Sequence, residues 1–460
     1  MAKLKVNKFI LNDVRCFKGE NTLNIRPLTF LVGANSTGKS TILGCFQAMA
    51  RFLSAYGPTN EKRTINFNRE PYDMGDFTDI VRRAKPKNTE FKLGCEIKPE
   101  DKAILNFYLQ FTFGEEPDAN DPAIKEMLLS FRDGDIRFIF SEPREPFRKP
   151  QIDLKETGSK KHFTVVQRKG EQATMFFLGL YQYFKLTFFP DGEPSHHLRV
   201  VRDDTDSSYQ ERELLKFVGE RNFHKDDEYD VYNNTHLTRS SFLDFEYYSF
   251  APSRAAPQRT YKAQGITGDA YGYDISEQLK DIITDDKETW EYLKEQLNNF
   301  GQFADLFTAI ELKLLGKSPK DPFQLEFKIG KTQATNIADV GYGISQVLPI
   351  LVTAMSYTNC TFLLQHPEVY LYPKAQATLV SILTVFSKMG NNNLIIETHN
   401  ESLIQQARNE ILNRHLNPGD ISLIYLEKKG TYVEVHNLSF DKKADFVPEP
   451  PESYDDFYML

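Results

Sequence analysis

A glycine-rich stretch near the N-terminus has the residue types and spacing of a phosphate-binding loop. It runs Gly33-Ala34-Asn35-Ser36-Thr37-Gly38-Lys39-Ser40-Thr41 and matches G-x-x-x-x-G-K-[ST] in full. The glycines let the backbone curl so that several N–H groups point at one anion. Lys39 brings a positive charge to the outer phosphates, and Ser40 offers a hydroxyl to Mg²⁺. The candidate phosphate-binding residues are Gly33, Asn35, Ser36, Thr37, Gly38, Lys39, Ser40 and Thr41.

The segments on either side of this loop favour a phosphate site over a chance glycine-rich turn. The apolar run 28–32 predicts a strand before the loop. After the loop, Ile42, Phe46, Met49 and Leu53 recur at three- and four-residue steps, which predicts a helix with one apolar face. That helix would add its positive N-terminal end to the site.

A second glycine-rich helix start lies near residue 343, within Asp339-Val340-Gly341-Tyr342-Gly343-Ile344-Ser345-Gln346. The N–H groups and the Ser345 hydroxyl of such a helix start can bind an anion. An ordinary helix cap is the alternative, and spacing alone favours the cap. The candidate ligand residues here are Gly343, Ser345 and Gln346.

Two further apolar strands end in polar residues. The first leads into Gln365-His366-Pro367-Glu368, and the second into Glu397-Thr398-His399. In P-loop ATPases the end of such a strand carries the carboxylate that holds Mg²⁺. Gln365 can offer only an amide oxygen there, so Ser40 and Gln365 are the predicted metal ligands. A general base must lie near the attacking water, which leaves Glu368 and Glu397 as candidates, with His399 near the γ-phosphate.

Composition limits the class of protein. The chain of 460 residues has a formal net charge of −8, so a protein that mainly coats DNA is disfavoured and direct nucleic-acid contact would be local. The four cysteines are far apart in sequence, which suggests neither zinc nor disulfides and fits a reducing cytoplasm. No uninterrupted apolar run reaches membrane-spanning length.

The middle of the chain differs in character from its ends. Strand-like pieces at 91–97, 104–109, 136–140 and 163–166 are separated by charged turns. They predict an inserted β-rich and helical lobe, with an elaborated surface loop as the alternative. Residues 275–315 are expected to be helical. The expected organisation is an N-terminal half of a head at 1–96, the insertion at 97–240, the C-terminal half at 241–440 and an acidic tail at 441–460.

These elements together resemble the AAA15/AAA21 branch of ABC-type ATPases, which includes the OLD and Gabija heads. The branch patterns G-x-N-S-x-G-K-S-T, G-x-P-x-R-x-x-P-x-R-x-Y, D-V-G-[FY]-G-x-S-Q, P-E-x-H-L-H-P and E-T-H-S are similar to segments here, within residues 3–53 and roughly 245–440. The resemblance implies an α/β, ABC-type P-loop ATPase head, with an antiparallel β lobe plus a mixed core sheet flanked by helices. It also implies ATP and Mg²⁺ as cofactors. Asn35, Lys39, Ser40, Ser345, Gln346, Glu368, Glu397 and His399 would then inherit the family roles.

The resemblance further implies self-association, because the helix start at Ser345 would close on the γ-phosphate bound by another subunit. The sequence departs from the branch at Gln365-His366, where acidic residues are common, and at Tyr370 and Tyr372, where histidines are common. Slow hydrolysis is therefore expected. A nucleotide-locked scaffold that never turns over is an alternative.

The TOPRIM nuclease that follows OLD and Gabija heads is not expected here, since only about 60 residues follow His399, too few for a domain of ordinary size. A stand-alone head with an insertion resembles the ATPase subunits of two-component anti-phage defence systems. That resemblance implies a homo-oligomer, a TOPRIM nuclease effector as partner and a phage-encoded trigger protein that mimics DNA. A RecF- or OLD-like role in DNA repair or DNA-end binding is the alternative.

Overall fold

The computed structural model describes thirteen stretches of the chain, and they fall into two compact units. The stretches are residues 4–53, 65–84, 87–99, 107–115, 120–131, 134–141, 151–157, 160–168, 245–261, 275, 278–279, 287–316 and 321–459. One unit consists of residues 1–22, 44–67 and 74–245, and the other of residues 23–43, 68–73 and 246–460. The residues with candidate chemistry all belong to the second unit.

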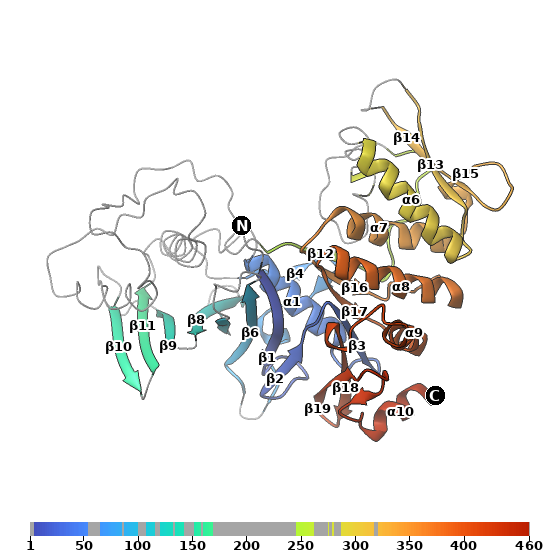
Figure 1. Ribbon diagram of the computed structural model, residues 1–460. Helices are drawn as coiled ribbons and strands as arrows, with labels where there is room; N and C mark the ends of the chain where they lie inside the picture. Colours follow the sequence, from blue (N-terminus) through green and yellow to red (C-terminus); the bar gives the residue numbers. More distant parts are fainter. Residues whose placement is uncertain are drawn as a thin grey trace, which may run out of the picture. The chain divides into compact units, whose positions relative to one another are not determined.

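The second unit is built on a seven-stranded sheet with the order β12-β16-β17-β3-β18-β19-β20 (Figure 1). Strands β12 to β18 in that order pair in parallel, and β19 and β20 add antiparallel strands at one edge. Every residue of β3, β16 and β17 is buried, which explains their uninterrupted apolar runs. The strands are β12 (Tyr247–Phe250), β16 (Thr361–Gln365), β17 (Asn393–Glu397), β3 (Leu28–Gly33), β18 (Ile421–Lys429), β19 (Tyr432–Phe440) and β20 (Phe446–Val447).

Helices pack against this sheet and against each other around one apolar core. α8 contacts both α9 and β17, and α6 contacts α7 and α8. α8 begins with Pro373 in its first turn, a position where proline costs no helical hydrogen bond. The helices are α1 (Lys39–Leu53), α6 (Lys287–Phe303), α7 (Tyr342–Ser356), α8 (Pro373–Met389) and α9 (Glu401–Leu412), with short 3-10 turns η1 (Ile337–Asp339) and η2 (Pro418–Asp420). The predicted strand, loop and helix around the glycine-rich stretch are confirmed, and no described helix is long and apolar enough to cross a membrane.

The first unit contains an eight-stranded sheet with the order β10-β11-β9-β8-β7-β6-β1-β2. Its strands are β10 (Gln151–Thr157), β11 (Lys160–Arg168), β9 (Gly134–Ser141), β8 (Pro122–Phe131), β7 (Phe107–Glu115), β6 (Glu90–Pro99), β1 (Leu4–Asn12) and β2 (Glu20–Asn24). β1, β6, β7, β8 and β9 pair as antiparallel neighbours, while β11 pairs in parallel with β9. The predicted antiparallel lobe and mixed core sheet are thus both present.

The strands expected in the inserted lobe continue this same sheet. β6 crosses the expected boundary between residues 96 and 97 and hydrogen-bonds with β7. The expected boundary rested on a change in composition. Backbone hydrogen bonds between strands do not depend on composition, so the strands on both sides of residue 96 join one sheet. The short helix α2 (Phe77–Ile80) begins at the cap residue Asp76. The helix expected near residues 213–218 lies outside the described residues.

The expectation that residues 275–315 are helical is correct for α6 and wrong for its last residues. Residues 309–314 form β13 (Ala309–Leu314), which pairs with β14 (Phe323–Lys328), and β14 pairs in turn with β15 (Thr335–Asn336). Ile310 of β13 and Phe327 of β14 are fully buried, so packing across the pair decides the conformation. A small hairpin, β4 (Asn68–Arg69) and β5 (Tyr72–Asp73), completes the sheets.

The residues expected to form an acidic tail are folded onto the core sheet. They contain β20 and the helix α10 (Glu452–Met459). Tyr454 is 5% exposed and meets the rings of Tyr425 and Phe446 edge to face at 5.2 and 5.3 Å. The Ser453 hydroxyl donates to Glu427 Oε1 at 2.6 Å. The buried aromatic contacts of Tyr454 therefore hold this segment on the sheet despite its acidic residues.

Tyr454→Ala should destabilise the second unit by about 2–4 kcal/mol, because it removes a buried ring and leaves a cavity. Urea unfolding followed by circular dichroism measures this. Asp455→Ala, at the exposed neighbouring position, is the matched control and should change the midpoint little. Equal midpoints for the two variants would show that α10 contributes nothing to the core.

Candidate functional site

The glycine-rich stretch forms a tight loop between β3 and α1. Gly33 has φ +147° and Gly38 has φ +92°, values that side-chain-bearing residues rarely adopt. A Cβ on Gly33 would lie 2.6 Å from the Leu426 carbonyl oxygen, so the neighbouring strand β18 also demands glycine there. Asn35 and Ser36 are exposed on the loop, whereas Thr37 is buried and donates to the Ala34 carbonyl at 2.9 Å.

Lys39 lies in the concavity of this loop. It is 4% exposed, and its ammonium donates to the carbonyl oxygens of Gly33 at 2.8 Å and Ala34 at 2.9 Å. Burial lowers the pKa of Lys39 from its ordinary value, and the nearby Glu397 carboxylate opposes that shift. The loop thus holds a cation close to a carboxylate at the start of α1.

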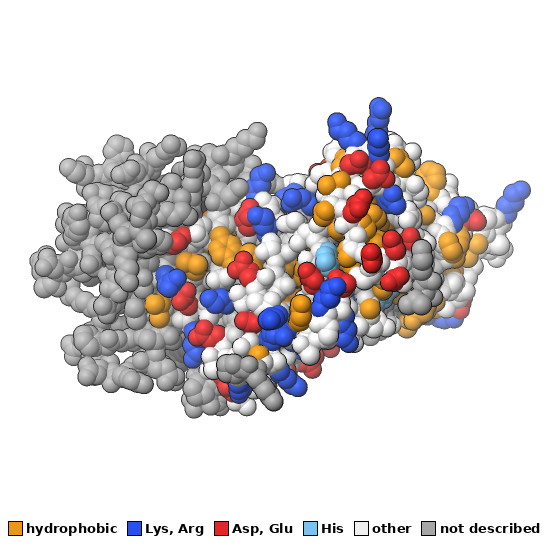
Figure 2. All heavy atoms as spheres, turned by 90° about the horizontal axis from the view of Figure 1, so that it is seen from below, with side chains coloured by type: hydrophobic (Ala, Val, Ile, Leu, Met, Phe, Trp, Pro, Cys, Tyr) orange, Lys and Arg blue, Asp and Glu red, His pale blue; other side chains and the backbone are white. Residues whose placement is uncertain are grey.

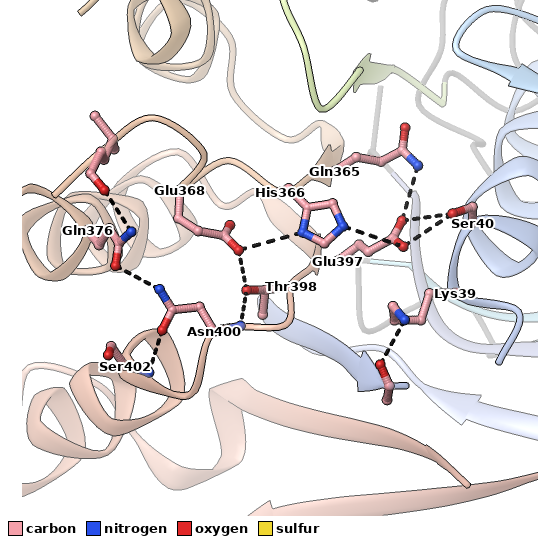
Figure 3. A network of polar contacts seen from close by, with 12 residues as sticks. Lys39, Ser40, Gln365, His366, Glu368, Gln376, Glu397, Thr398, Asn400 and Ser402 are labelled. Atoms are coloured by element: carbon pink, nitrogen blue, oxygen red, sulfur yellow. Dashed lines mark hydrogen bonds and ion pairs between the residues drawn. The ribbon is translucent and has the colours of Figure 1, made fainter. Parts of the chain in front are cut away.

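The carboxylate of Glu397 reaches the first turn of α1 (Figure 3). Strand register puts it there, because Glu397 pairs with Gln365 on one side and with Leu31 on the other. The Ser40 hydroxyl lies 3.2 Å from both Glu397 carboxylate oxygens, and Gln365 Nε2 donates to Oε2 at 3.1 Å. The Ser40 hydroxyl and the Glu397 carboxylate thus meet as hard oxygen donors, the type that Mg²⁺ prefers, and the Gln365 amide turns its nitrogen to the carboxylate.

His366 bridges the two acidic residues of the site. It has φ +44°, and its Nε2 lies 3.9 Å from Glu397 Oε1 while its Nδ1 lies 3.6 Å from Glu368 Oε1. Its ring stacks on His399 with centroids 4.9 Å apart. Burial, followed by the charge of Lys39, lowers the pKa of His399. The predicted residues Glu368, Glu397 and His399 are therefore brought together, with His366 between them.

Thr398 and Asn400 hold the second strand tip in place. The Thr398 hydroxyl donates to Glu368 Oε1 at 2.5 Å and accepts from the Asn400 backbone N–H at 3.0 Å. The Asn400 side chain caps α9 through Ser402 N at 2.9 Å and donates to Gln376 Oε1 at 2.7 Å. The tips of β16 and β17 and the starts of α8 and α9 thus form one polar network (Figure 3).

The hairpin of β4 and β5 adds Tyr72, for which the sequence gave no signal. Tyr72 is 5% exposed, and its hydroxyl has no hydrogen-bond partner among the described residues. Burial raises the pKa of Tyr72 well above its usual range, and the Glu397 charge adds to that rise. A neutral hydroxyl therefore lies near the site carboxylate.

The helix start at α7 makes its contacts away from the loop. The Ser345 hydroxyl donates to the Tyr342 carbonyl at 2.7 Å, and Gln346 is fully buried. Gln346 Oε1 accepts from the Arg254 backbone N–H at 2.7 Å. Within the described ranges, neither side chain hydrogen-bonds to the glycine-rich loop, so Gly343, Ser345 and Gln346 stay predicted ligands only.

Sequence reasoning missed His366, Tyr72 and Thr398 as site residues. The position of His366 directly after a buried strand was the available signal, since strand ends collect functional side chains in parallel sheets. Tyr72 and Thr398 carry no comparable signal, because the one lies in a turn-rich region and the other acts only through Glu368.

The chain was compared with protein-family models, with curated proteins and with solved structures. A family model described as "AAA ATPase domain", AAA_15, matches residues 4–404. No curated protein matches the chain. The similar solved structures include SMC heads, which at these TM-scores carry no argument about function.

One is an SMC head bound to the C-winged helix domain of ScpA (12% identity, 95% of this chain and 98% of that chain, TM-score 0.46). Another is an SMC head with an extended coiled coil from Pyrococcus furiosus (10%, 95% and 96%, 0.42). A third is the SMC head domain of Thermotoga maritima (10%, 94% and 98%, 0.38).

Gly33→Ala should distort the loop and lower stability by about 2–4 kcal/mol, because the new Cβ meets a backbone oxygen at an unfavourable φ. Gly419→Ala is the matched control, since nothing lies within 4 Å of a Cβ there. Differential scanning fluorimetry compares the two. A Gly33→Ala protein as stable as Gly419→Ala would contradict the described loop.

Proposed function

Because the chain belongs to the AAA_15 family of ATPase domains, we propose that it binds ATP with Mg²⁺ in the glycine-rich loop and hydrolyses it slowly. One observation carries this proposal: the Ser40 hydroxyl and the Glu397 carboxylate meet beside the loop that holds Lys39. Asn35 to Thr41 would hold the phosphates through loop N–H groups, the Lys39 ammonium and the helix N-terminus.

Glu397 is the proposed acidic ligand on the metal side. The oxygens of Ser40 and Glu397 fit Mg²⁺ by donor chemistry, and Gln365 orients the carboxylate. When bound, the ion would neutralise phosphate charge. The sequence assigned the strand-end position to Gln365 and left Glu397 as a candidate base. The direct contacts of Glu397 with Ser40 and Gln365 favour the metal role instead.

His366 is the proposed general base. Its imidazole lies between carboxylate oxygens of Glu368 and Glu397, and a neutral imidazole nitrogen can accept a proton from water. Glu368 is less suited, because one of its oxygens is bonded to Thr398 and its side chain is only 7% exposed. Glu368 is therefore assigned to orient His366, and His399 to stack on it.

Two substitutions separate these roles. Glu397→Gln should weaken ATP binding in the presence of Mg²⁺ by about tenfold or more while changing Mg²⁺-free binding little, because it removes the charged metal ligand. His366→Asn should leave binding intact and lower the turnover rate by about 10²-fold or more. Isothermal calorimetry and a phosphate-release assay measure the two effects.

Lys39→Ala is the control that defines background. Wild-type turnover no faster than that of Lys39→Ala would mean that the protein binds nucleotide without hydrolysing it. A Glu397→Gln protein with wild-type Mg²⁺ dependence would remove Glu397 from the metal site.

At a finer level, we propose that the protein is the sensor subunit of a two-component anti-phage defence system and resembles AriA, the ATPase subunit of PARIS. It would assemble as a cytoplasmic homo-oligomer, hold a TOPRIM nuclease effector inactive and release it on meeting a phage-encoded DNA-mimic protein. Support comes from the motif resemblance, in which the helix start at Ser345 completes the site of a neighbouring subunit. The net charge of −8 and the interspersed acidic and basic side chains in Figure 2 fit a protein partner better than DNA.

The sensor proposal is tested by affinity capture of the tagged full chain from its native host, with and without phage challenge, followed by mass spectrometry. We expect a nuclease that is captured with wild type before challenge and lost after it, and that Lys39→Ala fails to release. Capture without such a protein, together with ATPase stimulated by DNA and salt-sensitive DNA binding, would favour a DNA-repair role.

A further inference from the structure

Arg254 is a buried cation whose guanidinium is only partly hydrogen-bonded. The side chain is 2% exposed, and Nη1 donates to the Ala251 carbonyl at 3.0 Å. Nε and Nη2 are buried and have no hydrogen-bond partner within the part of the chain that the structure describes. Unmet donors on a buried guanidinium are costly, so their presence calls for an explanation.

The backbone around Arg254 is fixed to the first turn of α7. Gln346 Oε1 accepts from Arg254 N at 2.7 Å, and Gln346 Nε2 donates to the carbonyls of Arg254 at 3.2 Å and Ala255 at 3.3 Å. The Gln346 side chain that makes these bonds is fully buried, and Arg254 is 2% exposed. The backbone of Arg254 is therefore tied to the start of α7.

Glu368 is fixed to the other side, at the tip of β16. Its Oε1 accepts from the Thr398 hydroxyl at 2.5 Å, and its carbonyl accepts from Leu371 N at 3.1 Å. Its Oε2 is buried and, like the two Arg254 nitrogens, has no partner among the described residues. Burial dominates and lowers the pKa of Arg254 to about 10, and the negative charge of Glu368 opposes that shift.

A close-packed seam joins the start of α7 to the segment that follows β16. We define it by Tyr342 and Gly343 on the α7 side and by Tyr370 and Leu371 on the strand-tip side. A Cβ on Gly343 would lie 2.6 Å from the Tyr370 carbonyl oxygen, and the rings of Tyr342 and Tyr370 meet edge to face at 4.8 Å. Motion of the strand tip therefore has to be passed to α7 or accommodated by sliding along this seam.

We propose that Arg254 is a positioning residue that closes an ion pair with Glu368 across this seam when nucleotide binds. The inference rests on the proposed ATP site and adds the means by which that site signals to α7. Nucleotide in the loop would displace the Ser40–Glu397 contact, and the linked strand tips would then bring Glu368 Oε2 to Arg254. The pairing would satisfy three buried polar atoms at once and would hold His366 through Glu368.

A double-mutant cycle tests this coupling. Arg254→Gln, Glu368→Gln and the double variant are compared in two measurements on the full chain. One is the midpoint of thermal unfolding without nucleotide, and the other is the Kd of a fluorescent non-hydrolysable ATP analogue with Mg²⁺. We expect nearly additive effects on unfolding. In the Kd, each single variant should weaken binding about tenfold and the double variant no more than either.

Arg259→Gln is the matched control, because this exposed arginine in the same segment pairs with Asp339 and not with Glu368. It should leave the Kd within about twofold of wild type. If Arg254→Gln does not fold, Arg254→Lys takes its place, since it keeps the charge and loses the planar fork. Additive effects on the Kd would overturn the proposal, as would equal coupling in both measurements, which would mean a constant bridge through a buried water.

The outcomes separate this inference from the ATPase proposal. A wild-type protein that fails to bind the analogue, or binds it no better than Lys39→Ala, overturns both. Tight wild-type binding with an additive cycle overturns the ion pair and leaves the ATPase proposal standing.

Discussion

The site depends on one contact, the meeting of the Glu397 carboxylate with the Ser40 hydroxyl at the start of α1. The register of three parallel strands fixes it, because β17 lies between β16 and β3 and places Glu397 level with Leu31, at the mouth of the glycine-rich loop. A carboxylate that is 4% exposed has to be compensated. Ser40, Gln365 and the charge of Lys39 provide that compensation beside the glycine-rich loop.

This arrangement moves the acidic charge by one strand relative to the pattern expected from the sequence. The end of β16 holds Gln365, which donates to Glu397 and so orients it. The residue after it is His366, whose imidazole lies within 4 Å of carboxylate oxygens on both Glu397 and Glu368. In the roles we propose, the charge for the metal lies at the end of β17 and the general base directly after β16.

Much of the fold was predictable, because its signals are local. The loop pattern, the buried strands before Gln365 and Glu397 and the helix after the loop all depend on neighbouring residues. The sequence could not show that Glu397 reaches Ser40, since this depends on strand order. It also mistook the C-terminal segment for a tail, because the acidic residues outnumber the aromatic anchors that bury Tyr454. The sequence also did not reveal β13, because that strand depends on pairing with β14, which comes later in the chain.

Gln346 illustrates the limit of reasoning from a motif. Its position in a glycine-serine helix start suggests a ligand, yet all of its polar atoms are used to hold the segment around Arg254. Gly343 likewise has no room for a side chain because Tyr370 presses on it. These two residues therefore tie the start of α7 to Arg254 on one side and to the strand tip on the other. A helix start bound in this way cannot shift toward a phosphate without moving Arg254, whose Nε and Nη2 have no hydrogen-bond partner among the described residues. Glu368 Oε2 is the partner we propose for these nitrogens, because it too has no hydrogen-bond partner among the described residues. Glu368 belongs to the same polar network as Glu397, through which nucleotide binding would act on it.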